Sequence, residues 1–295
     1  MGLAKKVDLK VEAEVSQRSK DLAGGLFNQF NKWHETEHWG DKRVEAVLLR
    51  QKEQEIEFMK NRPARPDVPC VFSPSGASKC DRELFFKALR LKQIEEDKYP
   101  YHRRWTRNAT AVHEATQSDL LYMSMLMKNP DFTVKLAENG LPMWEENLKT
   151  HKIFEHNGAR FAILGMMDGI LTYKDGTDIG FEFKTKSNTL GQVGHYKMKA
   201  PAPYHLEQCN AYSLLFGLEE FVLMYESLPK DGWTKGAEAK VDIRTFYYKS
   251  TDEAKELLLD KFAEVTKAVE AENRPPMQSD KCLFCPYKYL CEGGK

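Results

Sequence analysis

Residues 165–187, GMMDGILTYKDGTDIGFEFKTKS, contain two apolar runs on either side of the three residues 174–176. This pattern predicts a β-hairpin, because a three-residue hairpin loop commonly ends in a glycine that adopts the left-handed conformation, and Gly176 stands at that position. In this register Asp168 lies opposite Glu182. A two-residue Asp-Gly turn would instead place these carboxylates on opposite faces of the hairpin.

The predicted register places three charged side chains on one face. Opposed residues of a hairpin have Cβ atoms roughly 5 Å apart, and Lys184 shares the face of Glu182 because it follows two residues later. Two carboxylates at such a short distance repel each other unless a cation lies between them. Carboxylate oxygens are ligands that Mg²⁺ and Mn²⁺ prefer. A lysine beside the metal orients or deprotonates a water molecule. Asp168, Glu182 and Lys184 therefore predict a metal-dependent hydrolytic site, most naturally for a phosphodiester.

An exposed structural hairpin would also carry alternating charged residues, and this alternative stands beside the catalytic one. Phe181, Phe183, Ile163 and Leu164 indicate that these strands are central in the sheet. An unpaired carboxylate is costly there, and this favours a functional site.

The rest of the 295-residue chain predicts a mixed α/β (α+β) fold. Residues 43–60 form a polar helix that a proline-rich segment separates from the remainder of the chain, so we expect a helical extension over 1–62 and one domain over 63–295. Within that domain, helices, then a cluster of strands, then further helices and strands predict a mixed central sheet flanked by helices.

Composition limits the classes of protein. The formal net charge is zero, so no global field attracts nucleic acid, and binding to phosphates must come from a local patch. No run of about 18 apolar residues and no apolar leader is present, which predicts a cytoplasmic protein with no membrane partner. Six cysteines in a reducing compartment argue against a disulfide framework.

The cysteines are unevenly spaced. Cys282, Cys285 and Cys291 form a C-x2-C-x5-C group near the end of the chain. A fourth thiolate is needed, and Cys80, in a Ser/Gly-rich loop before a helix, is the best candidate. Four thiolates bind either zinc or an iron–sulfur cluster, and the three-plus-one spacing favours a [4Fe-4S] cluster over a zinc ribbon.

Other polar residues accompany these motifs. His113 lies in a predicted long helix, and Gln208 and Tyr212 share one face of another helix because they are four residues apart. Local basic patches for phosphate contact lie around His113 and Lys184, and comprise Arg103, Arg104, Arg107 and Lys186 with its neighbours.

The order of these motifs resembles the PD-(D/E)XK nuclease superfamily, in its RecB-like branch with an iron–sulfur cluster, which includes CRISPR-associated, AddB-like and phage exonucleases. The resemblance covers about residues 70–295. The matching motifs are, in order, Cys80, His113, Gly165-x-x-Asp168, Glu182-x-Lys184, Gln208-x3-Tyr212 and the C-terminal cysteine triplet. Met167 replaces the proline of the superfamily's name.

The resemblance implies specific roles. His113, Asp168, Glu182 and the Phe183 carbonyl would hold the catalytic Mg²⁺ or Mn²⁺. Lys184 would help to activate the attacking water, and Gln208 and Tyr212 would position DNA. Cys80, Cys282, Cys285 and Cys291 would hold a structural [4Fe-4S] cluster. The expected function is a DNA exonuclease acting on single strands or duplex ends in phage or accessory recombination, replication or repair, with proteins of those processes as partners. No oligomeric state is implied.

Two alternatives compete with this interpretation. The first is a non-catalytic DNA-binding or scaffold protein with the same fold, against which the complete Asp/Glu/Lys/His set argues. The second is a zinc protease, because residues 34–38 read H-E-T-E-H. Only 33 residues precede that motif, and no third ligand follows at the usual spacing, so a surface helix with incidental histidines is favoured.

Overall fold

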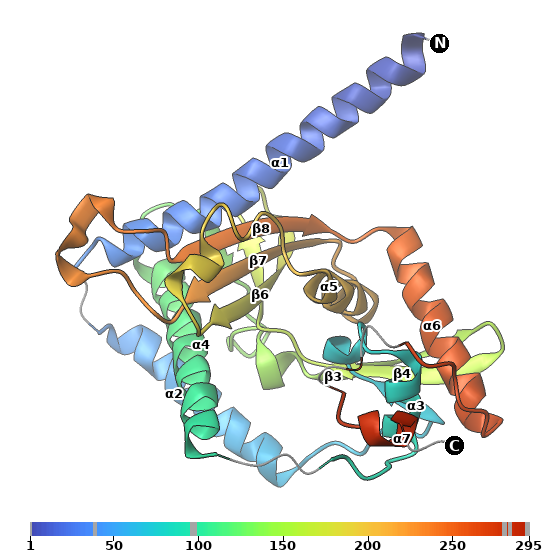
Figure 1. Ribbon diagram of the computed structural model, residues 1–295. Helices are drawn as coiled ribbons and strands as arrows, with labels where there is room; N and C mark the ends of the chain where they lie inside the picture. The colour runs from blue at the N-terminus through green and yellow to red at the C-terminus, as the bar shows by residue number, and fades with distance from the viewer. Residues whose placement is uncertain (1, 38–39, 95–98, 279–281, 283–284, 293–295) are drawn as a thin grey trace.

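The computed structural model describes residues 2–37, 40–94, 99–278, 282 and 285–292, and describes side chains from residue 17 onward (Figure 1). The helices are α1 (Gly2–His34), α2 (Lys42–Lys60), α3 (Asp81–Ala88), α4 (Pro100–Leu126), α5 (Pro203–Phe216), α6 (Asp252–Glu270) and α7 (Lys288–Glu292). The strands are β1 (Cys70–Phe72), β2 (Phe132–Val134), β3 (Thr150–His156), β4 (Ala159–Gly165), β5 (Gly169–Tyr173), β6 (Asp178–Lys186), β7 (Glu220–Ser227) and β8 (Ile243–Lys249).

The hairpin of β5 and β6 has the predicted three-residue register. Gly169 pairs with Phe181 and Thr172 with Asp178. Gly176 closes the loop with a φ of 88°, in the left-handed region that glycine adopts without strain. The two-residue turn is thereby excluded, and Asp168, just before β5, lies level with Glu182 on β6.

This hairpin is the centre of a five-stranded mixed sheet in the order β2-β5-β6-β7-β8. β6 and β7 are parallel, whereas the other neighbouring strands are antiparallel. Phe181 and Phe183 face one side and pack in a core shared with α1 and α4. Because strand side chains alternate, Glu182 and Lys184 face the other side, where α5 lies. The predicted mixed sheet with flanking helices is confirmed.

The second half of α1 belongs to the same core as the sheet. Leu22, Leu26 and Phe30 are fully or almost fully buried in it, and Figure 1 shows α1 crossing β8. Gln29 is also buried and exchanges two hydrogen bonds with the backbone of Phe132 in β2. The boundary near residue 62 stays a prediction, but this part of the extension packs as core.

A second sheet of three strands, in the order β1-β4-β3, lies beside the first. Its core includes α3, α6 and the C-terminal Cys285 and Tyr287. β4 leads through three residues into β5 of the larger sheet, so the two sheets meet at the chain segment that contains Asp168. Gly165 ends β4 where a Cβ atom would lie 2.6 Å from the ring of Pro74, so any larger residue would displace that loop.

Two local predictions need correction. The helix expected over 81–97 ends at Ala88, because Arg90 adopts a φ of 55° and the N–H of Leu91 bonds to the Phe86 carbonyl, a Schellman motif. The surface helix expected at the H-E-T-E-H segment is absent at residues 35–37, which therefore also lack the helix that a zinc protease requires. α1 ends at its first histidine, His34, whose ring contacts Asp119, and His38 lies outside the described residues. No described helix is long and apolar enough to cross a membrane.

Candidate active site

A cavity of about 390 Å³ lies where β4 passes into β5, between the larger sheet and α5. Asp168, Glu182 and Lys184 line it from the sheet, and Gln208 and Tyr212 line it from α5. The structure thus brings together five of the predicted site residues in one cavity. Their position follows from the hairpin register and from the packing of α5 on the face that Glu182 shares.

The carboxylate of Asp168 is fixed by the neighbouring strand. Its Oδ2 accepts a hydrogen bond of 2.8 Å from the Phe183 N–H, and its own carbonyl accepts one of 3.0 Å from the buried Gln117 on α4. The N–H and C=O of one strand residue point to the same edge, so the Phe183 carbonyl also faces the side of Asp168. This is the orientation that the predicted ligand role requires.

His113 on α4 reaches the same carboxylate. Its Nε2 lies 3.1 Å from Asp168 Oδ1, and its Nδ1 lies 3.2 Å from Glu145 Oε1. Burial lowers the pKa of His113, but the two carboxylates outweigh that effect and raise it to about 10. With one carboxylate on each ring nitrogen, the ring orientation of His113 is fixed toward Asp168.

Glu182 is the most unusual group of the site. Its side chain is 1% exposed, its Oε1 contacts the Lys184 ammonium, and its Oε2 accepts no hydrogen bond from the described residues. Burial first, and then the charge of Asp168, raises the pKa of Glu182. A buried carboxylate with an unpaired oxygen is costly, so Glu182 is suited to a cation that this side chain would share with Asp168.

Lys184 is the one basic side chain in direct contact with this carboxylate among the described residues, and forms an ion pair with Glu182. Burial lowers the pKa of Lys184, but Glu182 and Asp168 outweigh it and raise the pKa. The Lys184 ammonium is therefore held in its charged form beside the carboxylates of Glu182 and Asp168.

Gln208 and Tyr212 are coupled on α5. The Gln208 Nε2 donates a hydrogen bond of 2.7 Å to the Tyr212 hydroxyl, and both side chains are nearly buried. One turn earlier, His205 shares a 2.7 Å hydrogen bond with the Tyr225 hydroxyl of β7. Burial, assisted by the charges of Lys184 and Lys186, lowers the pKa of His205 to about 3, so this histidine is neutral.

The basic residues predicted to contact DNA occupy two places. Arg103, Arg104 and Arg107 lie exposed on the first three turns of α4. Lys186 ends β6, its ammonium is 5.5 Å from the centre of the Tyr225 ring, and burial and Lys184 lower its pKa. None of these four lines the cavity that contains Asp168.

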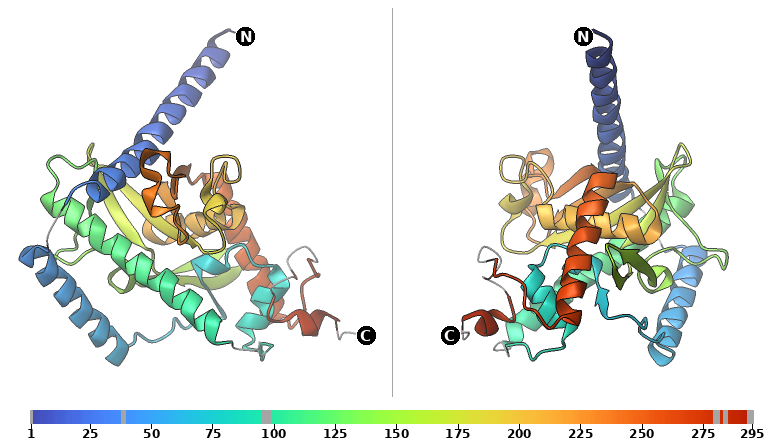
Figure 2. Two further views of the ribbon diagram at one scale, coloured as in Figure 1. Left: turned by 60° about the vertical axis from the view of Figure 1, so that its left-hand side comes forward. Right: turned by 90° about the vertical axis from the view of Figure 1, so that its right-hand side faces the viewer.

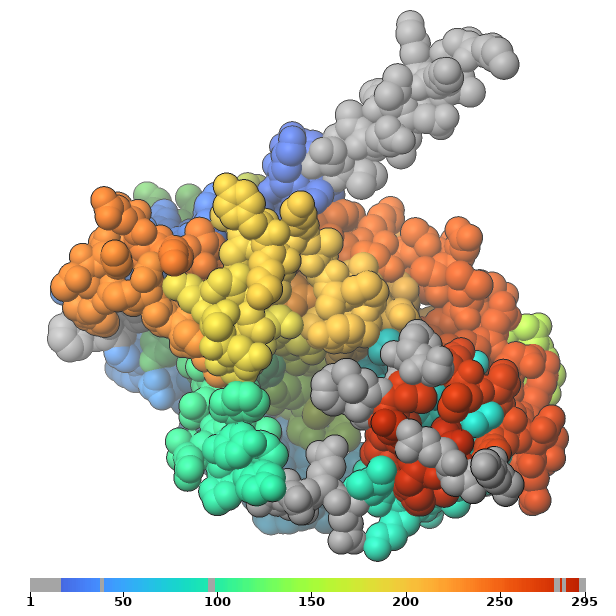
Figure 3. Space-filling view, in the orientation of Figure 1, coloured from blue at the N-terminus to red at the C-terminus, as the bar shows by residue number. Residues whose placement is uncertain are grey.

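The four predicted cluster cysteines lie at one end of the molecule. Cys80 caps α3, with its sulfur accepting the Glu83 N–H at 3.3 Å, and Cys285 is buried against the same helix. The C-terminal segment covers α3 through contacts such as Phe86 with Tyr287, and Figure 3 shows the two segments side by side. Burial raises the pKa of the Cys80 thiol, and raises that of Cys285 to about 11. No three of the four sulfur atoms lie within 4.8 Å of one another.

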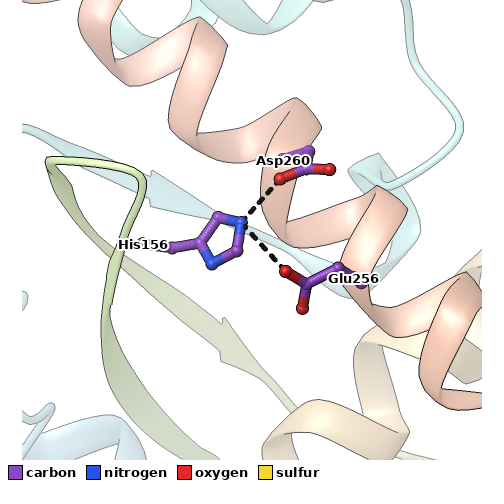
Figure 4. A group of neighbouring side chains, drawn as sticks. All are labelled: His156, Glu256 and Asp260. Carbon is purple, nitrogen blue, oxygen red and sulfur yellow. Dashed lines mark hydrogen bonds and ion pairs between the residues drawn. The ribbon is translucent and has the colours of Figure 1, made fainter.

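A different cluster does meet that distance, alone among the described parts of the chain. It comprises His156 at the end of β3 and Glu256 and Asp260 on α6 (Figure 4). The His156 Nε2 lies 2.7 Å from Asp260 and 3.8 Å from Glu256. The carboxylates are about half exposed, and the hydrogen bond between His156 and Asp260 joins the β3–β4 hairpin to α6.

A family model described as the PD-(D/E)XK nuclease superfamily matches residues 82–292. The chain belongs to this superfamily. The match includes the predicted metal-site and α5 residues and excludes Cys80, α1 and α2. A search of curated proteins found no match.

Solved structures show weaker similarity to this superfamily member. SSO0001 is 15% identical, with 86% of this chain and 98% of that chain covered and a TM-score of 0.40. The alkaline exonuclease of Laribacter hongkongensis is 12% identical (69% and 89% covered, TM-score 0.41). A phage-related exonuclease from Haemophilus somnus 129PT is 13% identical (69% and 93% covered, TM-score 0.34). The superfamily assignment rests on the family model rather than on these structures.

Sequence reasoning missed Glu145 and Gln117. Glu145 has a φ of 43°, an uncommon conformation for a residue other than glycine, and contacts His113. Gln117 lies one turn after His113 on α4 and holds the backbone of Asp168. The four-residue spacing of His113 and Gln117 was a usable signal. Nothing local marks Glu145, because its contact depends on how η2 (Glu145–Leu148) packs against α4.

Proposed function

We propose that this superfamily member is a metal-dependent deoxyribonuclease, with exonuclease action favoured, that hydrolyses phosphodiester bonds at Asp168, Glu182 and Lys184. The observation that carries the proposal is the buried Glu182 carboxylate, which contacts Lys184 through Oε1, leaves Oε2 without a hydrogen bond from the described residues, and shares a cavity with Asp168 and Lys184. A structural ion pair does not need a cavity beside it, whereas a catalytic site does.

The donor set suits Mg²⁺ or Mn²⁺. The ligands would be the Glu182 and Asp168 carboxylates, the Phe183 carbonyl and the His113 imidazole, a set of mostly hard oxygen donors. When bound, the metal would polarise the phosphate and lower the pKa of a coordinated water molecule.

The protein's own side chains would perform the remaining steps. Lys184, held charged by Glu182 and Asp168, would orient the attacking water and stabilise negative charge that develops on the phosphate. Tyr212 and Gln208 face the same cavity and would position the DNA backbone. The hydrogen bond between them fixes both side chains before substrate arrives, which reduces the ordering needed on binding.

The DNA would approach across exposed basic side chains. Arg103, Arg104 and Arg107 on α4, and Lys186 at the end of β6, would contact phosphates on the way to the cavity. The motif order supports an exonuclease of single strands or duplex ends in phage or accessory DNA recombination, replication or repair, with proteins of those processes as partners. This assignment also supports a cytoplasmic location.

We further propose that Cys80, Cys282, Cys285 and Cys291 hold a [4Fe-4S] cluster. The C-terminal segment packs on α3, which Cys80 caps, so thiols 200 residues apart in sequence share one end of the molecule. In a tetrahedral zinc site with Zn–S bonds of about 2.3 Å, sulfur atoms lie about 3.8 Å apart. The three-plus-one spacing of the cysteines supports a [4Fe-4S] cluster rather than a zinc ribbon.

The nuclease proposal is tested with end-labelled single- and double-stranded linear DNA in Mg²⁺, Mn²⁺ or EDTA. We expect metal-dependent loss of label with the wild type and none with Lys184→Ala. Circular single- and double-stranded DNA have no ends, so their cleavage would distinguish an endonuclease from an exonuclease. Binding without cleavage by the iron-loaded wild type would support the non-catalytic DNA-binding alternative.

The cluster proposal is tested on protein purified without oxygen. We expect a brown protein with broad absorbance near ~400 nm and about four irons per chain, and loss of both in Cys285→Ser. Stoichiometric zinc without iron would overturn the cluster and leave the nuclease proposal intact.

A further inference from the structure

A second cavity continues from the catalytic one. Its volume is about 570 Å³, and it shares Glu145, Lys149 and Leu164 with the cavity that contains Asp168. Its outer wall is the end of α2 and the extended segment 62–65 that comes after it. Figure 2 shows α2 beside α4, with this segment leading from α2 toward β1. The two cavities therefore form one groove, and part of it is built by the region outside the matched family residues.

The outer wall carries two arginines. The segment Arg62-Pro63-Ala64-Arg65-Pro66 has no helix or strand, and its two prolines favour extended conformations for it. An extended proline-rich chain repeats every three residues, so Arg62 and Arg65 point to one side, and both line the cavity. Neither forms an ion pair with any residue that the structure describes.

The acidic side chains that line the second cavity already have partners. Each has a basic partner: Glu55 with Lys52, Glu146 with Lys149, and Glu145 with His113. In this second cavity the uncompensated charge is therefore the positive charge of Arg62 and Arg65. An occupant with regularly placed negative charges matches this wall.

Apolar side chains lie between the charges. Phe58 is half-buried and Met59 is 60% exposed, and both line the cavity next to the arginines. Guanidinium groups beside an aromatic and an apolar side chain are typical of surfaces that bind single-stranded nucleic acid, because phosphates contact the former and bases pack on the latter. A small phosphate compound would not use the apolar part.

We propose that α2 and residues 62–65 hold one strand of nucleic acid that extends from the catalytic cavity along this groove, with Arg62 and Arg65 on its phosphates and Phe58 and Met59 against its bases. This inference rests on the proposed nuclease function. It assigns substrate binding to residues of the N-terminal extension and its linker, outside the domain that carries the chemistry.

The test uses the full-length chain with Lys184→Ala, which removes cleavage, and a fluorescein-labelled 20-nucleotide oligothymidylate. Anisotropy measures the dissociation constant from 50 to 300 mM salt. For Arg62→Gln/Arg65→Gln we expect about tenfold weaker binding at low salt. We also expect a plot of log affinity against log salt that is shallower by about 1.4, because each lost phosphate contact on a single strand contributes about 0.7.

The matched control removes the same charge elsewhere. Lys235→Gln/Lys240→Gln changes two exposed lysines of the loop between β7 and β8, which contributes no residue to the groove. We expect the control to bind like the parent. Equal binding by the arginine variant and the control would overturn the proposal.

A second readout separates this proposal from the nuclease proposal. With Lys184 restored, both double variants should hydrolyse bis(4-nitrophenyl) phosphate at the wild-type rate, because this small diester occupies only the catalytic cavity. The arginine variant alone should show a raised KM for the oligonucleotide. If the arginine variant lost activity equally on both substrates, the groove assignment would be overturned. If the wild type cleaved neither substrate, the nuclease proposal would be overturned, and the anisotropy measurement would still decide the groove assignment.

Discussion

Two groups in this protein combine a histidine with carboxylates, and their surroundings differ. His156, Glu256 and Asp260 lie close together at the surface, where each carboxylate is about half exposed and paired with the ring. At the candidate active site, Glu182 is 1% exposed, and although Oε1 contacts Lys184, Oε2 accepts no hydrogen bond from the described residues. The surface group meets a simple distance rule for a metal site, but its carboxylates are exposed to solvent and already contact His156.

The comparison teaches that the cost of burial identifies a functional site better than proximity does. Folding gains little from an exposed ion pair, and such pairs are common. A buried carboxylate with an unpaired oxygen lowers stability, so its presence beside a cavity indicates a ligand or substrate that compensates for it. Substitutions in and around the two groups test this contrast.

The same isosteric change, Glu to Gln, in each group should give the largest difference in DNA cleavage. Glu182→Gln should reduce cleavage of end-labelled DNA about a hundred- to thousandfold, because it removes a metal-binding charge. The melting temperature of Glu182→Gln should equal or exceed that of the wild type, because the variant no longer buries this negative charge. Glu256→Gln should leave cleavage unchanged. Equal losses in the two variants would contradict the contrast.

Glu145 should act through the orientation of His113. A carboxylate on one ring nitrogen of a metal-binding histidine typically accounts for about 10- to 100-fold in metal affinity. We therefore expect Glu145→Ala to weaken Mn²⁺ binding by that amount in calorimetry without DNA. Glu145→Gln, which still accepts the Nδ1 hydrogen bond, should lose much less. Identical affinities for the two variants would remove this positioning role.

His205 provides a pH test of burial. Its pKa is about 3 in the folded protein, against an ordinary value of 6.5. Between these pH values the unfolded chain binds a proton that the folded chain does not, so the free energy of unfolding falls as the pH falls below 6.5. From pH 7 to pH 5 this histidine should cost about 2 kcal/mol.

Urea unfolding of the wild type and His205→Asn at both pH values measures that contribution, because asparagine does not titrate and retains a polar group near Tyr225. The wild type should lose more stability than the variant on acidification. A parallel loss in both proteins would show that the ring of His205 is not shielded as the structure indicates.

The smallest effect is expected at the surface group. Asp260→Asn removes one charge from the ion pair with His156 and should lower the free energy of unfolding by about 0.5–1 kcal/mol, as for other exposed pairs. DNA cleavage and Mn²⁺ affinity should not change. A clear loss of Mn²⁺ affinity would show that this group, too, binds metal.

The sequence by itself determined the register that forms the site. Gly176 is three residues after Tyr173, and this local turn geometry alone aligned Asp168 with Glu182 and placed Lys184 on the same face. The alternation of Phe181 and Phe183 with these charged residues likewise indicated which face is core. Such features are predictable because they depend on neighbours in the chain and on the period of a strand.

Tertiary structure decided what surrounds that face. The contact of Glu145 with His113 and the groove beside Arg62 join segments that are dozens of residues apart, and no local pattern specifies their packing. The same applies to the early end of α3 at Ala88. Backbone propensity favoured a longer helix there, but the chain leaves the helix at Arg90. The residues that follow lie against the C-terminal segment, where the Pro286 carbonyl accepts a hydrogen bond from the Ile94 N–H. Local physics therefore set the chemistry of the site, and long-range packing set its access and its support.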